Sequence, residues 1–399
     1  MQTIAQKIDL KNLDKSNWET FRFEEIASKI SETVDPNSTT LDTYVGLEHL
    51  DAENIHIRRK GTPDDVSGGK LKCYPGDVIF GKRRAYQRKA AIVDFEGICS
   101  AHAFVFRVYP EVIDPKLFPF FLHSDQFMHR MVDISVGGLS PTINWGDLKH
   151  QEFLLPPKDQ QAQLAELLWA MDEVIERERE VLERMKVILE LKLKEFFEFP
   201  LIIKDEKKSG YMKTEIGWMP NEYELVQQKD IVEFINGRAY KKEEWENSGT
   251  PVIRLQNLTG TGEEFYYSSL ELPEKNYCKN GDLLFMWSAT FGAVIWKGER
   301  AIFHYHIWNV KCDNEKIRQQ FMFYNLEEIT RRMMRQVSGS TMPHITKEGM
   351  EKLKIGLPPL YVQDEIVSVL DQISETINSI ESKIASSQAL QKSLINQIF

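Results

Sequence analysis

The chain has 399 residues, 42% of them hydrophobic and 28% charged, which is ordinary for a globular protein and predicts two or three domains. No stretch of about 18 apolar residues occurs, so a membrane-spanning helix is not predicted. The four cysteines are widely spaced and contain no Cys-x-x-Cys pair, which disfavours disulfides or structural zinc and fits a reducing cytoplasm. The net charge of −10 argues against DNA as a partner unless basic residues gather locally.

The first region of the chain consists of short strand-like runs, such as Ala91-Ile92-Val93, broken by turn signals. Residues 82–89 follow one such run and contain five cations. They could lie along phosphates or direct arginine to guanine, or they could form a solvated basic turn. Because the cluster is local in an acidic protein, DNA contact is favoured. The residues expected to contact DNA in this region are Arg58, Arg59, Lys82, Arg83, Arg84, Tyr86, Arg88, Lys89 and Ser140.

A proline pair, Pro156-Pro157, ends the first region, and a long helix is predicted to follow it. An apolar seam steps by four and three residues from Leu164 to Phe196, and such a sustained heptad pattern predicts a coiled coil. A second apolar stripe lies beside this seam, so the helix is expected to bury a second face, either on its own globular domains or on another subunit. The stripe consists of Leu167, Val174, Val181 and Ile188.

The second region follows a polar linker and again contains strand-like runs. The alternation of Val252, Arg254 and Gln256 predicts a strand with one face turned away from the core. Arginine and amide side chains suit guanine and adenine readout, and the loop after residues 282–287 could touch base edges, although core packing of Trp287 is the alternative. The residues expected to contact DNA in this region are Arg254, Gln256, Asn257, Trp287, Ser288, Thr290, Ser338, Ser340 and Thr341.

The two halves of the chain repeat each other at about 200 residues. Residues 143–157 align with 345–359 without a gap, and residues 73–80 align with 278–285. Glycine-rich or serine-rich loops precede Pro141 and Pro343, and they could contact the DNA backbone or merely turn the chain. A second heptad helix ends the second half and is apolar where the first is polar, which favours pairing of the two helices with each other.

Several segments of the second half resemble the Type I restriction–modification specificity subunits. Residues 232–258 are similar to the opening of a target-recognition domain in that family, residues 281–292 to its central strand and turn, and residues 357–366 to its junction with the spacer helix. The first half contains the same motifs, with lower similarity to the family. It departs from the second where Lys82-Arg83-Arg84-Ala85 stands in place of Trp287-Ser288-Ala289-Thr290, so base contacts cannot be copied between halves.

The resemblance implies a non-catalytic DNA-binding subunit. Each recognition domain would read a few base pairs of one half of a split target, and the helix pair would fix the unread gap between the halves. Two methyltransferase subunits would dock on the chain, bind S-adenosylmethionine and methylate one adenine in each half-site. A restriction subunit that uses ATP and Mg²⁺ would join for cleavage, and a system that only methylates would give the same sequence here.

The predicted fold class is α+β. It has two related target-recognition domains and two long antiparallel coiled-coil helices, with pseudo-two-fold symmetry. The predicted segments are recognition domain 1 (1–157), spacer helix 1 (158–200), a linker (201–214), recognition domain 2 (215–357) and spacer helix 2 (358–399).

The sequence contains no motif for catalysis or for a cofactor. It lacks a phosphate-binding Gly-x-x-x-x-Gly-Lys-[Ser/Thr] loop, and it has Leu-Pro-Pro where adenine methyltransferases carry Asn/Asp-Pro-Pro-Tyr/Phe. His304 and His306 would lie on one face of a strand, but no further ligand is evident, so no metal site is predicted. Two rival functions stay open: an enzyme that acts on DNA unaided, and a coiled-coil scaffold that ignores sequence.

Overall fold

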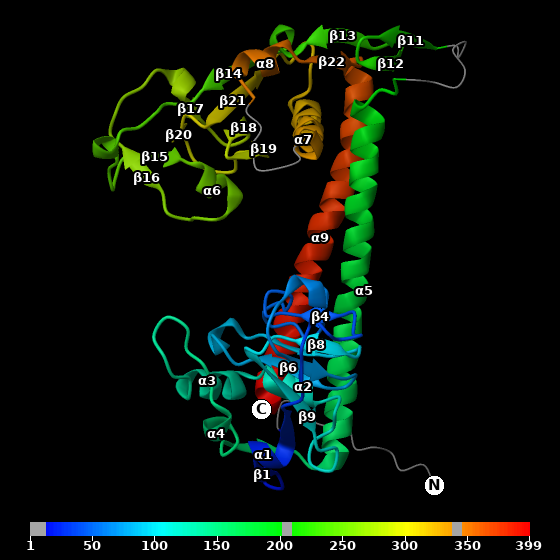
Figure 1. Cartoon of the computed structure of the whole chain (residues 1–399). Coiled ribbons are helices and arrows are strands. Elements are labelled where there is room, and N and C mark those ends of the chain that lie inside the picture. The colour runs from blue at the N-terminus through cyan, green and yellow to red at the C-terminus, as the bar shows by residue number, and fades with distance from the viewer. Residues whose placement is uncertain (1–12, 202–209, 337–344) are drawn as a thin grey trace. The chain divides into compact units, whose positions relative to one another are not determined.

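The computed structural model describes residues 13–201, 210–336 and 345–399, which form two compact units (Figure 1). The first unit contains the chain up to Glu180 together with Ile380–Phe399, and the second contains Val181–Ser379. Each unit therefore combines a globular domain with one end of each long helix.

The globular domain of the first unit is built on two four-stranded sheets. Neighbouring strands of the first sheet are antiparallel, and the second sheet includes one parallel pair. In spatial order the first sheet contains β2 (Ala27–Ile30), β9 (Ala103–Val108), β6 (Val78–Gly81) and β7 (Ala90–Ile92). The second contains β3 (Thr33–Val34), β5 (Lys70–Cys73), β8 (Gly97–Cys99) and β4 (Tyr44–Val45). Outside these sheets, β1 (Glu19–Arg22) pairs with β10 (Glu152–Leu155).

Strand β6 shows how the sequence places the basic segment. Its apolar run is uninterrupted, as expected of a strand that is covered on both faces. Since successive side chains of a strand point to opposite faces, Phe80 enters an aromatic core while Ile79 enters a second core that lines both sheets. The strand ends at Gly81, so residues 82–89 emerge from the end of a strand that both cores hold in place.

The aromatic core of the first unit lies between the first sheet and a set of short helices. Phe23 is fully buried at its centre, and its ring centroid is 5.0 Å from that of Phe106. Phe399 joins the same core, with its ring 5.2 Å from that of Phe121. These helices are α1 (Phe23–Ile26), α2 (Phe118–Leu122), α3 (Asp125–Asp133), α4 (Trp145–Leu148) and the 3-10 turn η2 (Ala85–Gln87). A further 3-10 turn of the domain, η1 (Pro63–Asp65), contributes no residue to this core.

The second unit repeats this architecture. Its first sheet contains β14 (Val232–Asn236), β21 (Ile307–Cys312), β18 (Leu283–Ser288) and β19 (Thr290–Ile295), and its second contains β16 (Tyr266–Ser268), β15 (Thr250–Ile253), β20 (Ala301–Phe303) and β17 (Tyr277–Cys278). A third pair joins β13 (Glu224–Gln227) to β22 (Lys354–Leu357). The helices are α6 (Leu255–Thr259), α7 (Gln319–Gln336), α8 (Lys347–Lys352), and the 3-10 turns η3 (Gln228–Asp230), η4 (Lys242–Glu244) and η5 (Glu274–Asn276).

The repeat extends to individual hydrogen bonds at matched positions. Gln161 Nε2 donates to the carbonyl of Pro156 at 2.8 Å, and Gln363 Nε2 donates to that of Pro358 at 2.8 Å. The oxygen of each buried amide accepts a backbone N–H from its own domain, so the start of each long helix is fixed to its domain in the same way. An Asp77–Arg107 ion pair likewise corresponds to a pair of Asp282 with Lys311. The predicted internal duplication is confirmed.

The two long helices pair within each unit. Helix α5 (Lys158–Phe197) has 40 residues and α9 (Leu360–Ile398) has 39, so each is about 60 Å long. In the first unit, Leu168 of α5 shares the aromatic core with Leu394 of α9. In the second unit, Leu193 of α5 shares a core with Leu370 of α9. The beginning of each helix therefore packs on the end of the other, which confirms the predicted antiparallel pair.

Two further observations concern the predicted segments. Residues 211–214, assigned above to the linker, form β11 (Tyr211–Thr214), which pairs with β12 (Gly217–Pro220). The stripe beside the seam of α5 is open to solvent in part: the exposed fractions of Val174, Val181 and Ile188 are 51%, 43% and 41%.

Among the helices that the structure describes, none combines the length and the apolar character needed to cross a bilayer.

Candidate nucleic-acid interface

In the first unit, several of the predicted DNA-contacting residues lie at the end of β6. We call residues 82–89 the first tip. Arg84 adopts left-handed backbone angles, with φ +57°, and its side chain donates to Ser140 Oγ at 3.1 and 3.2 Å. The backbone N–H of Arg84 donates to the carbonyl of Pro141 at 2.7 Å. The basic segment and the glycine-rich loop, about 55 residues apart in the chain, therefore form one surface.

The cations of the first tip differ in how accessible they are to a DNA ligand. Arg83, Arg84 and Tyr86 are exposed, and Lys82 is half-buried with its ammonium 5.2 Å from the centroid of the Phe104 ring. Arg88 instead lies between two carboxylates, Glu53 at 2.8 Å and Asp125 at 2.7 Å.

Lys89 is also engaged inside the domain, because its ammonium donates to the carbonyl of Leu47 at 2.6 Å. Arg88 and Lys89 thus have a structural role that their place in a basic run did not reveal. Two other candidates, Arg58 and Arg59, form ion pairs with Glu176 and Asp51. Arg58 therefore joins the domain to α5, and its availability to phosphate is reduced.

In the second unit, the turn between β18 and β19 contains Trp287, Ser288 and Thr290, and we call residues 287–290 the second tip. Trp287 is half-buried, lies parallel to Trp308 with ring centroids 5.6 Å apart, and donates its indole N–H to the carbonyl of Tyr305 at 2.9 Å. Thr290 is exposed and Ser288 is half-buried. Trp287 thus packs on the core while its neighbours remain accessible.

The two tips are equivalent positions of the duplicated domain. Ala289 in the second tip has φ +61°, which matches the left-handed backbone of Arg84 in the first. Left-handed angles are uncommon for residues with a side chain, so their recurrence at one position indicates a shared turn rather than chance. The chemistry differs between them, because the lysine that faces Phe104 in the first domain is replaced by the tryptophan that faces Trp308 in the second.

The predicted strand through Arg254 and Gln256 is wrong, because β15 ends at Ile253 and Leu255–Thr259 form the short helix α6. The cause is local hydrogen bonding by Asn257. Its Oδ1 accepts the N–H of Arg254 at 2.9 Å, and its Nδ2 donates to the carbonyls of Gly262 and Glu264. Such bonds compete with strand pairing. Asn257 and Arg254 are engaged locally, whereas Gln256 is exposed.

Two other segments stand as follows. Ser338, Ser340 and Thr341 lie outside the described residues. His304 and His306 are not on a strand as expected, since β20 ends at Phe303 and a turn follows. Their ring centroids are 5.4 Å apart, and burial, with the charges of His306 and Arg254, lowers the pKa of His304 to about 4.

A group of aromatic side chains near this turn was missed by the sequence reasoning. Trp245 lies 4.9 Å from Tyr240, 4.7 Å from Tyr266 and 5.9 Å from His304, as measured between ring centroids. Arg254 lies over Tyr266 at 4.2 Å. The only available signal was the spacing of aromatic residues among cations, which also occurs in ordinary cores. These rings border the second tip through His306, which lies 5.7 Å from Trp287.

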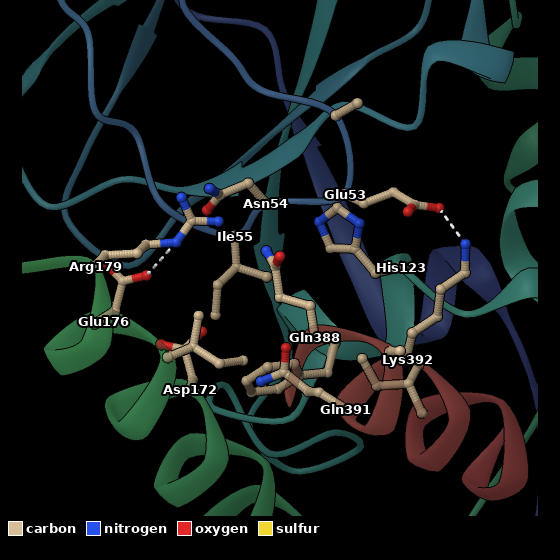
Figure 2. A pocket seen from close by; sticks show the side chains of 15 residues that line it. Glu53, Asn54, Ile55, His123, Asp172, Glu176, Arg179, Gln388, Gln391 and Lys392 are labelled. Atoms are coloured by element: carbon tan, nitrogen blue, oxygen red, sulfur yellow. Dashed lines mark hydrogen bonds and ion pairs between the residues drawn. The ribbon is translucent and has the colours of Figure 1, made fainter. Parts of the chain in front are cut away.

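The first unit also contains a polar cavity of about 380 Å³ where its globular domain meets the two helices (Figure 2). Figure 2 shows side chains from the domain, from α5 and from α9 turned toward it, with Lys392 paired to Glu53 at 2.7 Å. The labelled residues are Glu53, Asn54, Ile55, His123, Asp172, Glu176, Arg179, Gln388, Gln391 and Lys392.

Beside this cavity lies a group that could hold a metal ion, formed by His56, Asp172 and Glu176, whose ligand atoms all lie within 4.8 Å of one another. His56 Nε2 is 2.7 Å from Asp172 Oδ2. Glu176 already faces two guanidinium groups, those of Arg58 and Arg179. These pairs compensate its charge and attach the domain to α5, which is the role that the geometry supports.

His123 forms a buried wall of the cavity and makes stability depend on pH. Its Nε2 donates to the carbonyl of Ala90 at 2.8 Å, and burial, assisted by the charge of Arg88, lowers the pKa of His123 to about 4. The ordinary pKa in an unfolded chain is about 6.5. The unfolded state therefore binds more protons between these two values, so stability is complete above pH 6.5 and declines toward pH 4, by up to about 3 kcal/mol.

A His123→Gln variant is expected to lose this part of the pH dependence. Chemical denaturation at pH 7, 6, 5 and 4 measures it, with a His150→Gln variant as control because His150 is exposed. Equal pH slopes for the wild type and the His123→Gln variant would show that the imidazole does not contribute.

Comparison with known proteins places these features in a family. The family model described as "Type I restriction modification DNA specificity domain" matches residues 15–186 and 220–387. A putative type I restriction enzyme MjaX specificity subunit from Methanocaldococcus jannaschii is 23% identical over 366 residues, which cover 88% of this chain and 84% of that protein.

Two solved structures show the same fold. One, from work on complex assembly and conformational transition of the type I R-M system, has a TM-score of 0.60 at 20% identity, over 96% of each chain. The S subunit of a Type I restriction–modification system from M. genitalium has a TM-score of 0.54 at 15% identity, over 97% of this chain and 98% of that one. Because the family model matches both halves of the duplicated sequence, the chain belongs to the family of Type I restriction–modification DNA specificity proteins.

Proposed function

We propose that this specificity subunit reads a split DNA target, with one recognition domain on each half. The observation that supports this most is the pair of equivalent tips. Each follows the matching strand of its own domain's first sheet and contains the same turn, yet the first presents Arg83 and Arg84 and the second presents Ser288 and Thr290. A scaffold that ignores sequence has no need for different chemistry at one position, whereas two different half-sites require it.

The proposed role of α5 and α9 is to set the number of unread base pairs between the two halves. The support is their length and their pairing, since a heptad seam holds helices rigidly over many turns. The seam of α9 is buried at Ile366, Leu370, Ile377, Ile380 and Ile384. A rigid strut converts its own length into a distance between the recognition surfaces.

We further propose that methyltransferase subunits dock on α5, bind S-adenosylmethionine and methylate one adenine in each half-site. The support is the exposed stripe that includes Val174 in the first unit and Val181 and Ile188 in the second. Apolar side chains in a row on a charged helix are typical of a protein contact. This chain then supplies specificity and no catalytic group, while a restriction subunit would use ATP and Mg²⁺.

Selection of duplexes from a random pool by the full chain, alone and with its methyltransferase subunits, tests this function. A consensus in two parts with a fixed gap is expected, bound more tightly when the partners are present because the free chain carries a net charge of −10. Selected duplexes without any consensus would favour a scaffold. Adenine methylation by the purified chain alone would instead favour an unaided enzyme.

A further inference from the structure

Two lysines of the first domain face one small cavity without a carboxylate partner. Lys29 lies on β2 opposite Phe106 of β9, and Lys82 follows β6 with its ammonium over Phe104. Both line a cavity of about 70 Å³ together with Ser31 and Phe104. Within the described residues, neither ammonium has an acidic side chain at ion-pair distance, whereas other lysines of this domain, such as Lys60 and Lys72, are paired.

This arrangement is unfavourable for the free protein. Burial lowers the pKa of Lys82, and the positive charge of Lys29 lowers it further. Two like charges that share a partly buried site without compensation destabilise the fold unless another group compensates them. The cavity, at about 70 Å³, has room for ordered water or for one small polar group.

The second domain shows that the fold does not require these lysines. The strand register aligns Lys29 with Phe234, Lys82 with Trp287, and Phe104 with Trp308. Phe234 and Trp287 both pack on Trp308, at 5.4 and 5.6 Å between ring centroids. The same place is thus an apolar aromatic cluster in one domain and a pair of free cations in the other.

We propose that Lys29 and Lys82 form a phosphate seat that binds a DNA backbone phosphodiester, and that the second domain has no such seat. The proposal rests on the proposed function, because the exposed Arg83 and Arg84 of the first tip adjoin the seat. A phosphate there would supply the missing negative charge and fix the register of the first domain on the duplex, while the tip contacts the bases. The first domain would then hold its half-site partly through this buried phosphate contact, which the second domain lacks.

The test is the salt dependence of duplex binding by the full chain, measured by fluorescence anisotropy. Each phosphate that a protein neutralises contributes about 0.9 to the slope of log K against log salt concentration. A Lys29→Gln/Lys82→Gln double variant is expected to have a slope smaller by about 1 on any duplex, whatever its sequence. A Lys116→Gln/Lys149→Gln variant of the same domain and the same charge is the control, and its slope should stay close to that of the wild type.

A measurement without DNA separates the seat from a structural role. Because the two ammonium groups repel each other, the double variant is expected to unfold at the same temperature as the wild type or higher. An unchanged salt slope, or a fall in slope equal to that of the control, would overturn the seat while leaving the proposed function intact. A chain that binds no duplex even at low salt with its methyltransferase subunits present would overturn both.

A competition experiment with inorganic phosphate tests whether the seat binds a phosphodiester of DNA or a free phosphate ion. The proposal is supported if millimolar phosphate weakens duplex binding no more than chloride does at equal ionic strength. The seat would then bind phosphate as part of the DNA backbone and not as a free ion. Tight binding of phosphate alone, lost in the double variant while duplex binding is unchanged, would assign the seat to a free anion and contradict the proposal.

Discussion

A Trp308→Ala variant is expected to lose about 3–5 kcal/mol of the free energy of unfolding of the second unit, together with recognition of one half of the target. Trp308 is fully buried between two rings, with centroids 5.9 Å from that of Phe285 and 5.6 Å from that of Trp287. Removing it leaves a large cavity, because interiors are close-packed and relax only in part. It also removes the surface on which Trp287 rests, so the second tip loses its fixed geometry.

The effect should be confined to one domain. Hydrogen exchange should show faster opening of β14, β18 and β21, while β2, β6 and β9 of the first domain keep their protection. Duplex selection should retain the consensus of one half and lose that of the other. Loss of both halves at once, with intact protection in the first domain, would contradict independent recognition.

The matched control is Trp308→Phe, which introduces the residue that the first domain has at this position. The phenyl ring preserves stacking on Trp287 and fills most of the space. The indole N–H of Trp308 has no hydrogen-bond partner within the described residues, so its removal leaves no polar group unsatisfied. We expect a cost of about 1 kcal/mol and an unchanged target, by denaturation and selection. A cost equal to that of alanine would refute the packing explanation.

Features that repeat along the chain could be predicted from the sequence. The heptad seam predicted the two long helices, because an apolar residue every three or four positions is sufficient to define a buried stripe. The duplicated landmarks predicted two domains of one architecture, which the matched amides of Gln161 and Gln363 confirm. Periodicity and duplication are properties of the chain itself, so they need no knowledge of distant contacts.

Side-chain roles at the tips could not be predicted so well. Arg88 and Lys89 belong to a basic run, but their partners, Asp125 and the carbonyl of Leu47, are distant in sequence. Asn257 ends a strand through bonds to carbonyls several residues ahead, which alternation of residue types does not reveal. Lys29 was missed because a single lysine on a short strand gives no signal until Lys82 is placed beside it.

Lengthening the helical strut should change the gap in the recognised DNA by a fixed amount. Seven residues inserted into α5 after Glu180, and seven into α9 after Ser379, preserve the heptad seam in both helices. Seven helical residues add about 10 Å, and duplex DNA rises about 3.4 Å per base pair, so the gap should grow by about three base pairs. The bases read in each half should not change.

An insertion of four residues in each helix is the control for this experiment. Four residues do not preserve the heptad phase, so the seam residues of one helix no longer face those of the other. This variant is expected to bind DNA weakly and without a sharp gap, as measured by the same selection. Its failure would show that the seven-residue variant works through a preserved seam and not through general tolerance of insertions.

The gap of the selected consensus, compared between the wild-type chain and the seven-residue variant, tests the central claim most directly. The account predicts two unchanged half-sites separated by about three more base pairs. Two unchanged half-sites at the original separation would contradict it, because the helices would then not determine the distance at which the two domains read DNA.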